Sequence, residues 1–421
     1  MYGFALSAAI VSVLFSAVAR VWAGDFAVRD GDTVVFLGDS ITAAGLYGRY
    51  VENYTLLRFP NHKVQFINAG WGGDTAEGAL RRLGRDVFDR GATLLTVAYG
   101  INDIGWGTRA DDEHIRRHLE AIRGIVEQCR KHKVRVFICS AAITAEDPAT
   151  AETGTLQKMG DQAMAISREL GEGAIDVQRT MRRIQKRILE ANAQAKTDKD
   201  KVTLHAEDGV HLNDLGQLAM AFAILKGLGA PSEVSSVDVD CQGPRLLDAR
   251  GCRVEALAGG STQVEFTRID DGYPLNWAPF WPLASYRWIP ITEELNKYML
   301  SVRGLSAGRY EVLADDRPLG FFPERELERG VNLCSATADG WHPGGPWDAR
   351  AGLLKAATAA RWELFLAQRG ANTYLATAPD LPALRTQLDR TMSELISLQR
   401  LMVQPHAIRF TVRPMPPEKP K

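Results

Sequence analysis

The chain has 421 residues, of which 45% are hydrophobic and 24% charged, so we expect two or three globular domains and no extensive disorder. Its formal net charge is −1 and it has no basic stripe, which argues against a nucleic-acid partner. Beyond the amino terminus, no stretch of the sequence is apolar enough to suggest a membrane span.

The amino terminus predicts export. Residues 4–19 are apolar, and Val21-Trp22-Ala23 has the small-x-small form of a signal-peptidase site. The apolar run is short for a bilayer span. We therefore predict a signal peptide over residues 1–23, cut after Ala23, and a secreted or periplasmic protein. The alternative is an uncleaved anchor, because no Lys or Arg precedes the apolar run.

Between residues 30 and 230, runs typical of strands alternate with amphipathic helical runs, which predicts a parallel sheet with helices on both faces. The expected fold class is α/β, a three-layer α/β/α doubly wound domain over residues 24–232. Strands are expected near 33–38, 64–69, 94–99, 135–141 and 174–177. Helices are expected at 112–132, 156–170, 181–192 and 215–228.

The pattern then changes to short alternating runs, which predict a small β-sandwich-like domain over residues 233–323. Its strands are expected at 234–241, 252–257, 263–269, 286–291, 298–303, 310–314 and 318–322. A helical region over 324–421 follows, with helices at 349–369 and 381–403. Residues 408–412 alternate again, so these helices could be an insertion in the β-domain.

Four polar motifs follow one another in the first domain. The strand Thr33–Leu37 runs into Gly38-Asp39-Ser40, and the next two strands end in segments that contain Gly73 and Asn102. The fourth segment, Asp208-Gly-Val-His211, is expected to open a late helix. Chemistry in open α/β sheets gathers at the carboxyl ends of the strands, which is where the first three motifs fall.

With Ser40, Gly73, Asn102 and His211 in this order, residues 30–230 resemble the SGNH, or GDSL-type, serine hydrolases, a family with a flavodoxin-like α/β/α fold. The resemblance does not extend beyond residue 235. It selects Gly73 over the neighbouring Gly70 and Gly72.

The chemistry of these residues fits an esterase. A serine hydroxyl needs an adjacent base, and His211 is the natural one. Asp208 lies three residues earlier, so on one helical turn its carboxylate could accept the Nδ1 proton of His211. The backbone amides of Ser40 and Gly73 and the side-chain amide of Asn102 are the candidate oxyanion donors. Asp39 and Asp103 are expected to hold turns.

We therefore expect a secreted serine esterase that needs no cofactor and no metal, with Ser40, His211 and Asp208 as its triad. The resemblance makes O-acetyl esters of carbohydrates the preferred substrate. A lipid ester or thioester, an O-acyltransferase reaction and a non-catalytic carbohydrate-binding role are the alternatives. The partner is thus a small-molecule or polysaccharide ester, while the oligomeric state stays open.

Three features lie outside these motifs. Cys241 and Cys252 flank a turn-like segment and could form a disulfide in an oxidising compartment, with two free thiols as the equal alternative. An aromatic stretch around Trp281 and Trp288 could contact sugar, although core packing is the preferred interpretation. We expect residues 235–421 to shape the substrate cleft without supplying a catalytic group.

Overall fold

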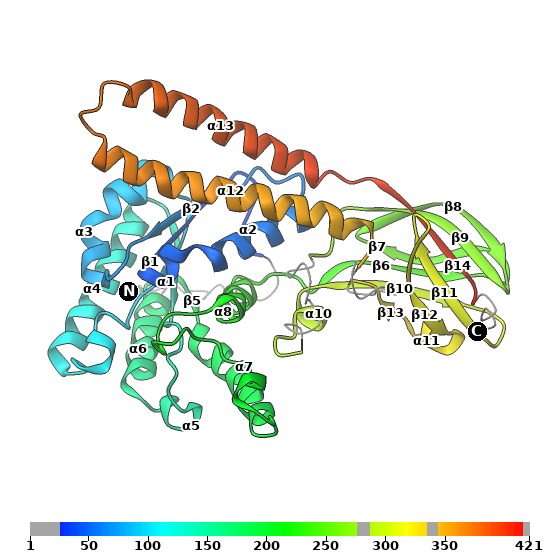
Figure 1. Ribbon diagram of the computed structural model, residues 1–421, viewed down its shortest axis with the longest axis horizontal. Helices are drawn as coiled ribbons and strands as arrows, with labels where there is room; N and C mark the ends of the chain where they lie inside the picture. Colours follow the sequence, from blue (N-terminus) through cyan, green and yellow to red (C-terminus); the bar gives the residue numbers. More distant parts are fainter. Residues whose placement is uncertain (1–25, 276–286, 335–343, 416–421) are drawn as a thin grey trace, which may run out of the picture.

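The computed structural model describes residues 26–275, 287–334 and 344–415. The segment assigned to the signal peptide and Trp281 lie outside these residues. Within them, the chain forms an α/β unit, two further sheets and a long helical hairpin that lies over the α/β unit (Figure 1). No helix in this part of the chain is both long and apolar enough to cross a membrane.

The first unit is a five-stranded parallel sheet with strand order β2-β1-β3-β4-β5. Its strands are β1 (Thr33–Gly38), β2 (Gln65–Gly70), β3 (Leu94–Ala98), β4 (Arg135–Cys139) and β5 (Gly173–Ile175). Successive residues of β1 belong to opposite cores, Val34 and Phe36 to one and Val35 and Leu37 to the other. Burial on both faces explains why β1 is an unbroken apolar run.

The helices of this unit are α1 (Ser40–Ala44), α2 (Leu46–Arg58), α3 (Ala76–Asp86), α4 (Asp112–Lys131), α5 (Pro148–Ala151), α6 (Thr155–Glu169), α7 (Val177–Asn192) and α8 (Asp214–Gly227). Helices α3, α4 and α6 pack together on one face of the sheet, and α2, α7 and α8 on the other. The predicted three-layer α/β fold is confirmed.

The second sheet has the order β13-β10-β6-β7 and the third β12-β11-β14-β9-β8. Their strands are β6 (Glu233–Asp240), β7 (Arg245–Arg250), β8 (Cys252–Gly260), β9 (Gln263–Asp270), β10 (Lys297–Arg303), β11 (Arg309–Ala314), β12 (Arg317–Pro323), β13 (Val331–Asn332) and β14 (Ala407–Pro414). The short helices α10 (Ile291–Glu294) and α11 (Glu324–Arg329) connect them. The expected β-rich region with a helical carboxy-terminal part is confirmed.

Two expectations for this region are wrong. Residues 287–290 form a turn that leads into α10 instead of a strand, and residues 245–250 form β7 instead of a turn. The ladder between β6 and β7 decides this, because it pairs residues 245–250 with β6 although most of their side chains are exposed. Trp288 is buried in the core, so the preferred interpretation of this ring as core packing is confirmed.

The Cys241–Cys252 disulfide is not formed, and both thiols are free. The Cys252 thiol lies 3.4 Å from the carbonyl oxygen of Ser236, on β6. Cys241 follows the end of the same strand, five residues further on, and a rise of about 3.3 Å per residue puts it roughly 16 Å away. A disulfide needs Cα atoms within about 7 Å.

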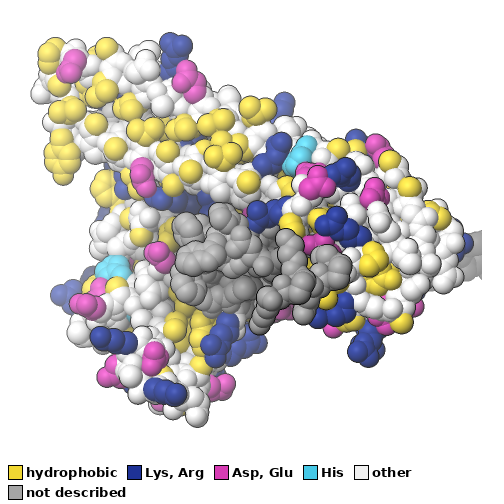
Figure 2. All heavy atoms as spheres, turned by 45° about the vertical axis from the view of Figure 1, so that its right-hand side comes forward, with side chains coloured by type: hydrophobic (Ala, Val, Ile, Leu, Met, Phe, Trp, Pro, Cys, Tyr) yellow, Lys and Arg dark blue, Asp and Glu magenta, His cyan; other side chains and the backbone are white. Residues whose placement is uncertain are grey.

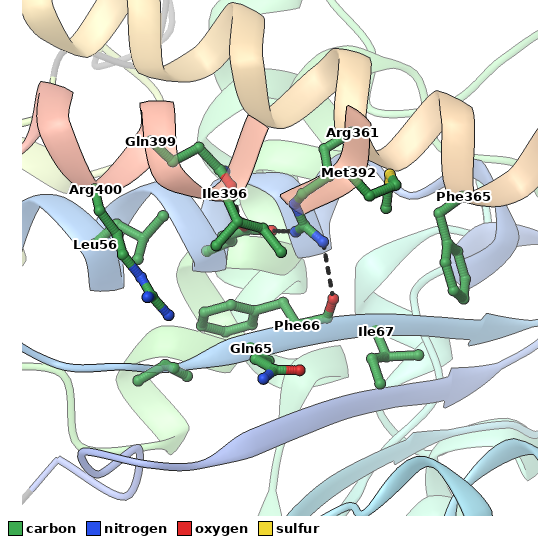
Figure 3. A pocket seen from close by; sticks show the side chains of 12 residues that line it. Leu56, Gln65, Phe66, Ile67, Arg361, Phe365, Met392, Ile396, Gln399 and Arg400 are labelled. Carbon is green, nitrogen blue, oxygen red and sulfur yellow. Dashed lines mark hydrogen bonds and ion pairs between the residues drawn. The ribbon is translucent and has the colours of Figure 1, made fainter. Parts of the chain in front are cut away.

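The hairpin consists of α12 (Pro346–Tyr374) and α13 (Leu381–Met402), and β14 then returns to the third sheet between β9 and β11. Helix α12 packs on α2, and α13 packs on α12. A cavity of about 180 Å³ remains between the hairpin and the edge strand β2 (Figure 3), with Phe66 and Ile67 on one wall and Met392 and Ile396 on the other. Apolar side chains run along the outer side of the hairpin (Figure 2), and Leu353, Leu384, Leu398 and Leu401 are exposed.

A buried polar network attaches the hairpin to α2. The Glu52 carboxylate accepts hydrogen bonds from Arg361, from Trp362 Nε1 at 2.6 Å and from Gln399 Nε2 at 2.9 Å. All four of these residues are buried. A buried carboxylate is tolerated when it is paired and hydrogen-bonded, and removing one of its partners is costly. The network therefore fixes where α12 lies on the α/β unit.

Candidate active site

The nucleophile candidate lies at the tight junction between β1 and α1. Asp39 caps α1 by accepting the Ile41 N–H at 3.0 Å, and Ser40 is the first helical residue. Gly38 cannot carry a side chain, because a Cβ there would lie 2.0 Å from Thr42 Oγ1 and 2.9 Å from the Ala98 carbonyl oxygen. The glycine therefore lets β1 end close to β3, with the serine at the carboxyl edge of the sheet.

Ser40 Oγ lies 2.8 Å from His211 Nε2, and His211 Nδ1 lies 2.5 Å from Asp208 Oδ2. The structure thus brings together three side chains that lie near the start and the end of the sequence of the α/β unit. The expected helix at this point is wrong, since α8 begins only at Asp214, after the Asn213 cap. Asp208 and His211 lie instead in a turn, in which Asp208 Oδ1 accepts the N–H groups of Val210 and His211, each at 2.9 Å. These backbone bonds hold the carboxylate in place without a helix.

The hydrogen bond from His211, together with those from the Val210 and His211 amides, lowers the pKa of Asp208 to about 2. Asp208 is therefore ionised throughout the neutral range. A carboxylate at Nδ1 holds the imidazole in the tautomer whose Nε2 can accept a proton from Ser40.

The oxyanion candidates lie on the loops after β2 and β3, the two neighbours of β1 in the sheet. Gly73 has φ of +73°, a conformation that favours glycine, and a Cβ there would meet nothing within 4 Å. Asn102 Nδ2 donates to the Asp74 carbonyl oxygen at 3.0 Å, next to Gly73. The Trp71 N–H donates to the Gly38 carbonyl oxygen at 3.0 Å, which joins the Gly73 loop to the end of β1.

Sequence reasoning missed Trp106. Its Nε1 donates to Asn102 Oδ1 at 2.9 Å, and its ring meets that of His211 edge-on, with 5.7 Å between ring centres. The residue has φ of +57°, which is unusual for a bulky side chain, and lies between Gly105 and Gly107, which also have positive φ. The Gly-Trp-Gly triplet, whose tryptophan stands four residues after Asn102, was the signal available in the sequence.

The two supporting aspartates hold turns, as expected. Asp39 caps α1, and Asp103 Oδ1 accepts the Ala76 N–H at 3.0 Å at the start of α3. Asp103 Oδ1 also lies 3.0 Å from His118 Nδ1. These contacts connect the loop that carries Asn102 to helices α3 and α4.

The buried carboxyl group of Asp39, next to Ser40, makes the stability of the protein depend on pH. Burial raises its pKa from 3.8 to about 6. Because the folded state then binds more protons than the unfolded state between pH 4 and 6, the contribution of Asp39 to stability falls as pH rises through this window. Asp39→Asn keeps a helix cap and removes the charge. We expect it to be more stable than wild type by up to about 3 kcal/mol above pH 7, and about equal near pH 4.

Urea unfolding of both proteins at pH 4.5 and pH 7.5 measures this difference. A stability gap between Asp39→Asn and wild type that does not widen toward pH 7.5 would contradict the prediction.

A pocket of about 180 Å³ is lined by Trp106, whose ring meets that of His211. The rest of its lining is mixed, with apolar Ile101, Ile104 and Leu156 and polar Thr144, Glu146 and Thr155. In the described part of the chain, no three or more His, Cys, Asp or Glu side chains lie together in a way that could hold a metal ion.

Comparison with one solved structure agrees with this fold. The chain matches a gut microbial diltiazem-metabolizing enzyme with a TM-score of 0.76 and 21% identity, over 94% of this chain and 100% of that chain. It also matches an acetylxylan esterase from Geobacillus stearothermophilus, with a TM-score of 0.41, 20% identity and coverage of 48% of this chain and 95% of that one. An alpha/beta hydrolase from the metagenome of Lake Arreo, Spain, has a TM-score of 0.40 and 20% identity, over 49% of this chain and 98% of that chain.

No curated protein matches the chain significantly. Residues 36–219 match the model of the GDSL-like lipase/acylhydrolase family. This range includes the end of β1, the strands β2 to β5 and the Ser40, Gly73, Asn102 and His211 segments. The protein therefore contains a GDSL-like lipase/acylhydrolase domain of the SGNH type and is an ester-bond hydrolase.

Proposed function

We propose that the protein is a serine esterase that works through Ser40, His211 and Asp208 and a covalent acyl-enzyme. The supporting observation is the continuous hydrogen-bond path from Ser40 Oγ through His211 to Asp208, with separations of 2.8 and 2.5 Å. In the first step Ser40 Oγ attacks the ester carbonyl carbon while its proton passes to His211 Nε2. His211 then gives that proton to the departing alcohol oxygen as the carbon–oxygen bond breaks.

In the second step a water molecule attacks the acyl-enzyme, and its proton passes to His211 Nε2. The proton then moves to Ser40 Oγ as the acid leaves, which restores the enzyme. The charge on the carbonyl oxygen in each step would be stabilised by the N–H groups of Ser40 and Gly73 and by Asn102 Nδ2. An amide nitrogen carries two hydrogens, so Asn102 can hold the Asp74 carbonyl with one and meet the substrate with the other.

For the substrate, we propose an O-acetyl ester of a carbohydrate. The pocket beside Trp106 is small, about 180 Å³, whereas pockets for drug-sized ligands have about 300–1,000 Å³. This size favours a short acyl group over a long lipid chain. The indole of Trp106 is 50% exposed beside His211 and offers an apolar ring face to a sugar.

We also propose export through a signal peptide over residues 1–23, on the sequence pattern alone. The domain division that we propose is an SGNH hydrolase domain over 24–232, an accessory β-domain over 233–323 and a helical region over 324–421. The position of β14 between β9 and β11 supports the view that the α12–α13 hairpin is an insertion in the β-domain.

A chain-length series tests the substrate proposal. We expect kcat/KM to be highest for p-nitrophenyl acetate and to fall about tenfold or more by the octanoate, because each misplaced methylene in a fitted pocket costs about 10- to 200-fold. Acetate released from acetylated polysaccharides, measured by NMR, checks the alcohol side, with Ser40→Ala as the blank. Higher activity on octanoyl or dodecanoyl esters would contradict the acetyl preference and favour a lipid acyl hydrolase.

A further inference from the structure

The loop that carries Gly73 is held on both sides. The Trp71 N–H donates to the Gly38 carbonyl oxygen at 3.0 Å, and the Asp74 carboxylate accepts from Arg82 Nε at 2.9 Å. After β2 ends at Gly70, residues Trp71, Gly72 and Gly73 are all exposed, and a Cβ on either glycine 72 or 73 would meet nothing within 4 Å. Of residues 71–73, only Trp71 has a side chain. Contacts to its ring are therefore a further restraint on the direction of the Gly73 N–H.

Two guanidinium groups lie against the Trp71 ring. The Cζ of Arg369 is 4.7 Å from the ring centre and that of Arg85 is 5.3 Å from it, both within the range of a cation–π interaction. Arg369 Nη2 also donates to the Gly70 carbonyl oxygen at 3.1 Å. Arg369 thus contacts both the backbone of the loop, at Gly70, and the Trp71 ring. Arg85 contacts only the ring in this loop, and its guanidinium bonds the neighbouring Asp86.

Arg369 comes from α12, outside the family domain, and its position is fixed by Trp362 two helical turns earlier. Residues seven positions apart lie on the same face of a helix. The Trp362 ring packs against Gly45 and Gly48, and a Cβ on Gly48 would lie 2.3 Å from it. Trp362 Nε1 donates to the buried Glu52. Next to Trp362, Arg361 extends from α12 toward Phe66 on β2 (Figure 3) and donates to its carbonyl oxygen at 3.4 Å.

We propose that Arg369 is a positioning residue of the active site: by holding the Gly70 carbonyl and the Trp71 ring, it keeps the Gly73 N–H turned toward the substrate oxyanion. The inference rests on the proposed function, in which Gly73 is an oxyanion donor. Because Arg369 lies on α12, the helical hairpin would then contribute to the catalytic rate as well as to stability. A donor that is misdirected by about 1 Å can cost up to about 10²-fold in rate.

The test compares Arg369→Ala and Arg369→Lys with wild type on p-nitrophenyl acetate. We expect kcat to fall about 10- to 100-fold in Arg369→Ala, with KM within about twofold, because an oxyanion donor acts mainly on the transition state. Arg369→Lys should fall less, since an ammonium group can still donate to Gly70 but lacks the planar guanidinium. Added methylguanidine should restore part of the activity of Arg369→Ala.

The matched control is Glu363→Ala, which removes an exposed contact of the same helix with Arg49 on α2, at 3.4 Å, and touches no part of the loop. It should keep wild-type kcat. Unchanged kcat in Arg369→Ala, a change confined to KM, or an equal loss in Glu363→Ala would each overturn the inference. Thermal melting of every variant separates unfolding from misdirection.

Trp71→Ala keeps the inference testable if Arg369→Ala does not fold. Because the two residues share the ring contact, while Arg369 also bonds the Gly70 carbonyl oxygen, Trp71→Ala should lower kcat too, and the double variant should lose less than the product of the two single losses. Additive losses would overturn the inference. Ser40→Ala is assayed in parallel: if it stays active, the proposed function fails, whereas an inactive Ser40→Ala beside a fully active Arg369→Ala refutes the positioning role alone.

Discussion

Replacing Ser40 or His211 by alanine is expected to remove nearly all esterase activity, a loss of at least about 10³-fold in kcat. Ser40 Oγ and His211 Nε2 are 2.8 Å apart, so either change removes the same nucleophile–base pair. The double variant should be no worse than either single one, since residues that act as a unit are not additive. Initial rates on p-nitrophenyl acetate and circular dichroism of each variant measure activity and fold.

Asp39→Asn serves as the control, because it changes the residue next to Ser40, keeps a helix cap and leaves the Ser40–His211 pair in place. A Ser40→Ala protein that kept more than about a tenth of wild-type kcat would refute the nucleophile assignment.

Asn102→Ala is expected to lower kcat by about 10²–10³, with little change in KM. The structure supplies the reason: Nδ2 is held by the Asp74 carbonyl and Oδ1 by Trp106 Nε1, so the amide is oriented before substrate arrives. A preoriented donor stabilises charge in the transition state without reorganisation. Steady-state kinetics on a small aryl acetate separate the effects on kcat and KM.

Asn102→Asp is the sharper variant, because it keeps the size of the side chain while the amide donor becomes a carboxylate. It should be at least as damaging as Asn102→Ala, since a negative charge would face the oxyanion. An effect of either variant on KM alone would show that Asn102 binds substrate and is not an oxyanion donor.

In the carboxy-terminal half, helix α12 contacts the site region. Trp288 does not line the cleft: it is buried in the core, which was the preferred interpretation of this ring. The contacts that reach the site region come from α12, whose Arg369 bonds Gly70 and whose Trp362 packs against Gly45, at the end of α1. Neither residue belongs to a sequence motif of the family domain.

The order of strands and helices in the α/β unit, and the position of Ser40 at the end of β1, could be predicted from the sequence. Both follow from local chemistry: an apolar run buried on two faces, then a glycine and a serine at a turn. Asn102 and His211 could be named because their motifs stand at the ends of recognisable elements. Each of these signals consists of residues close together in the sequence, so it can be recognised without knowledge of distant contacts.

Only the tertiary structure decided the rest, because the deciding contacts join residues far apart in the chain. β7 exists because it pairs with β6, although its own side chains are mostly exposed. The turn at His211 is set by backbone bonds to Asp208, where the spacing alone suggested a helix. The roles of Trp106 and Arg369 follow from their partners in the fold, since Trp106 bonds Asn102 and Arg369 bonds Gly70.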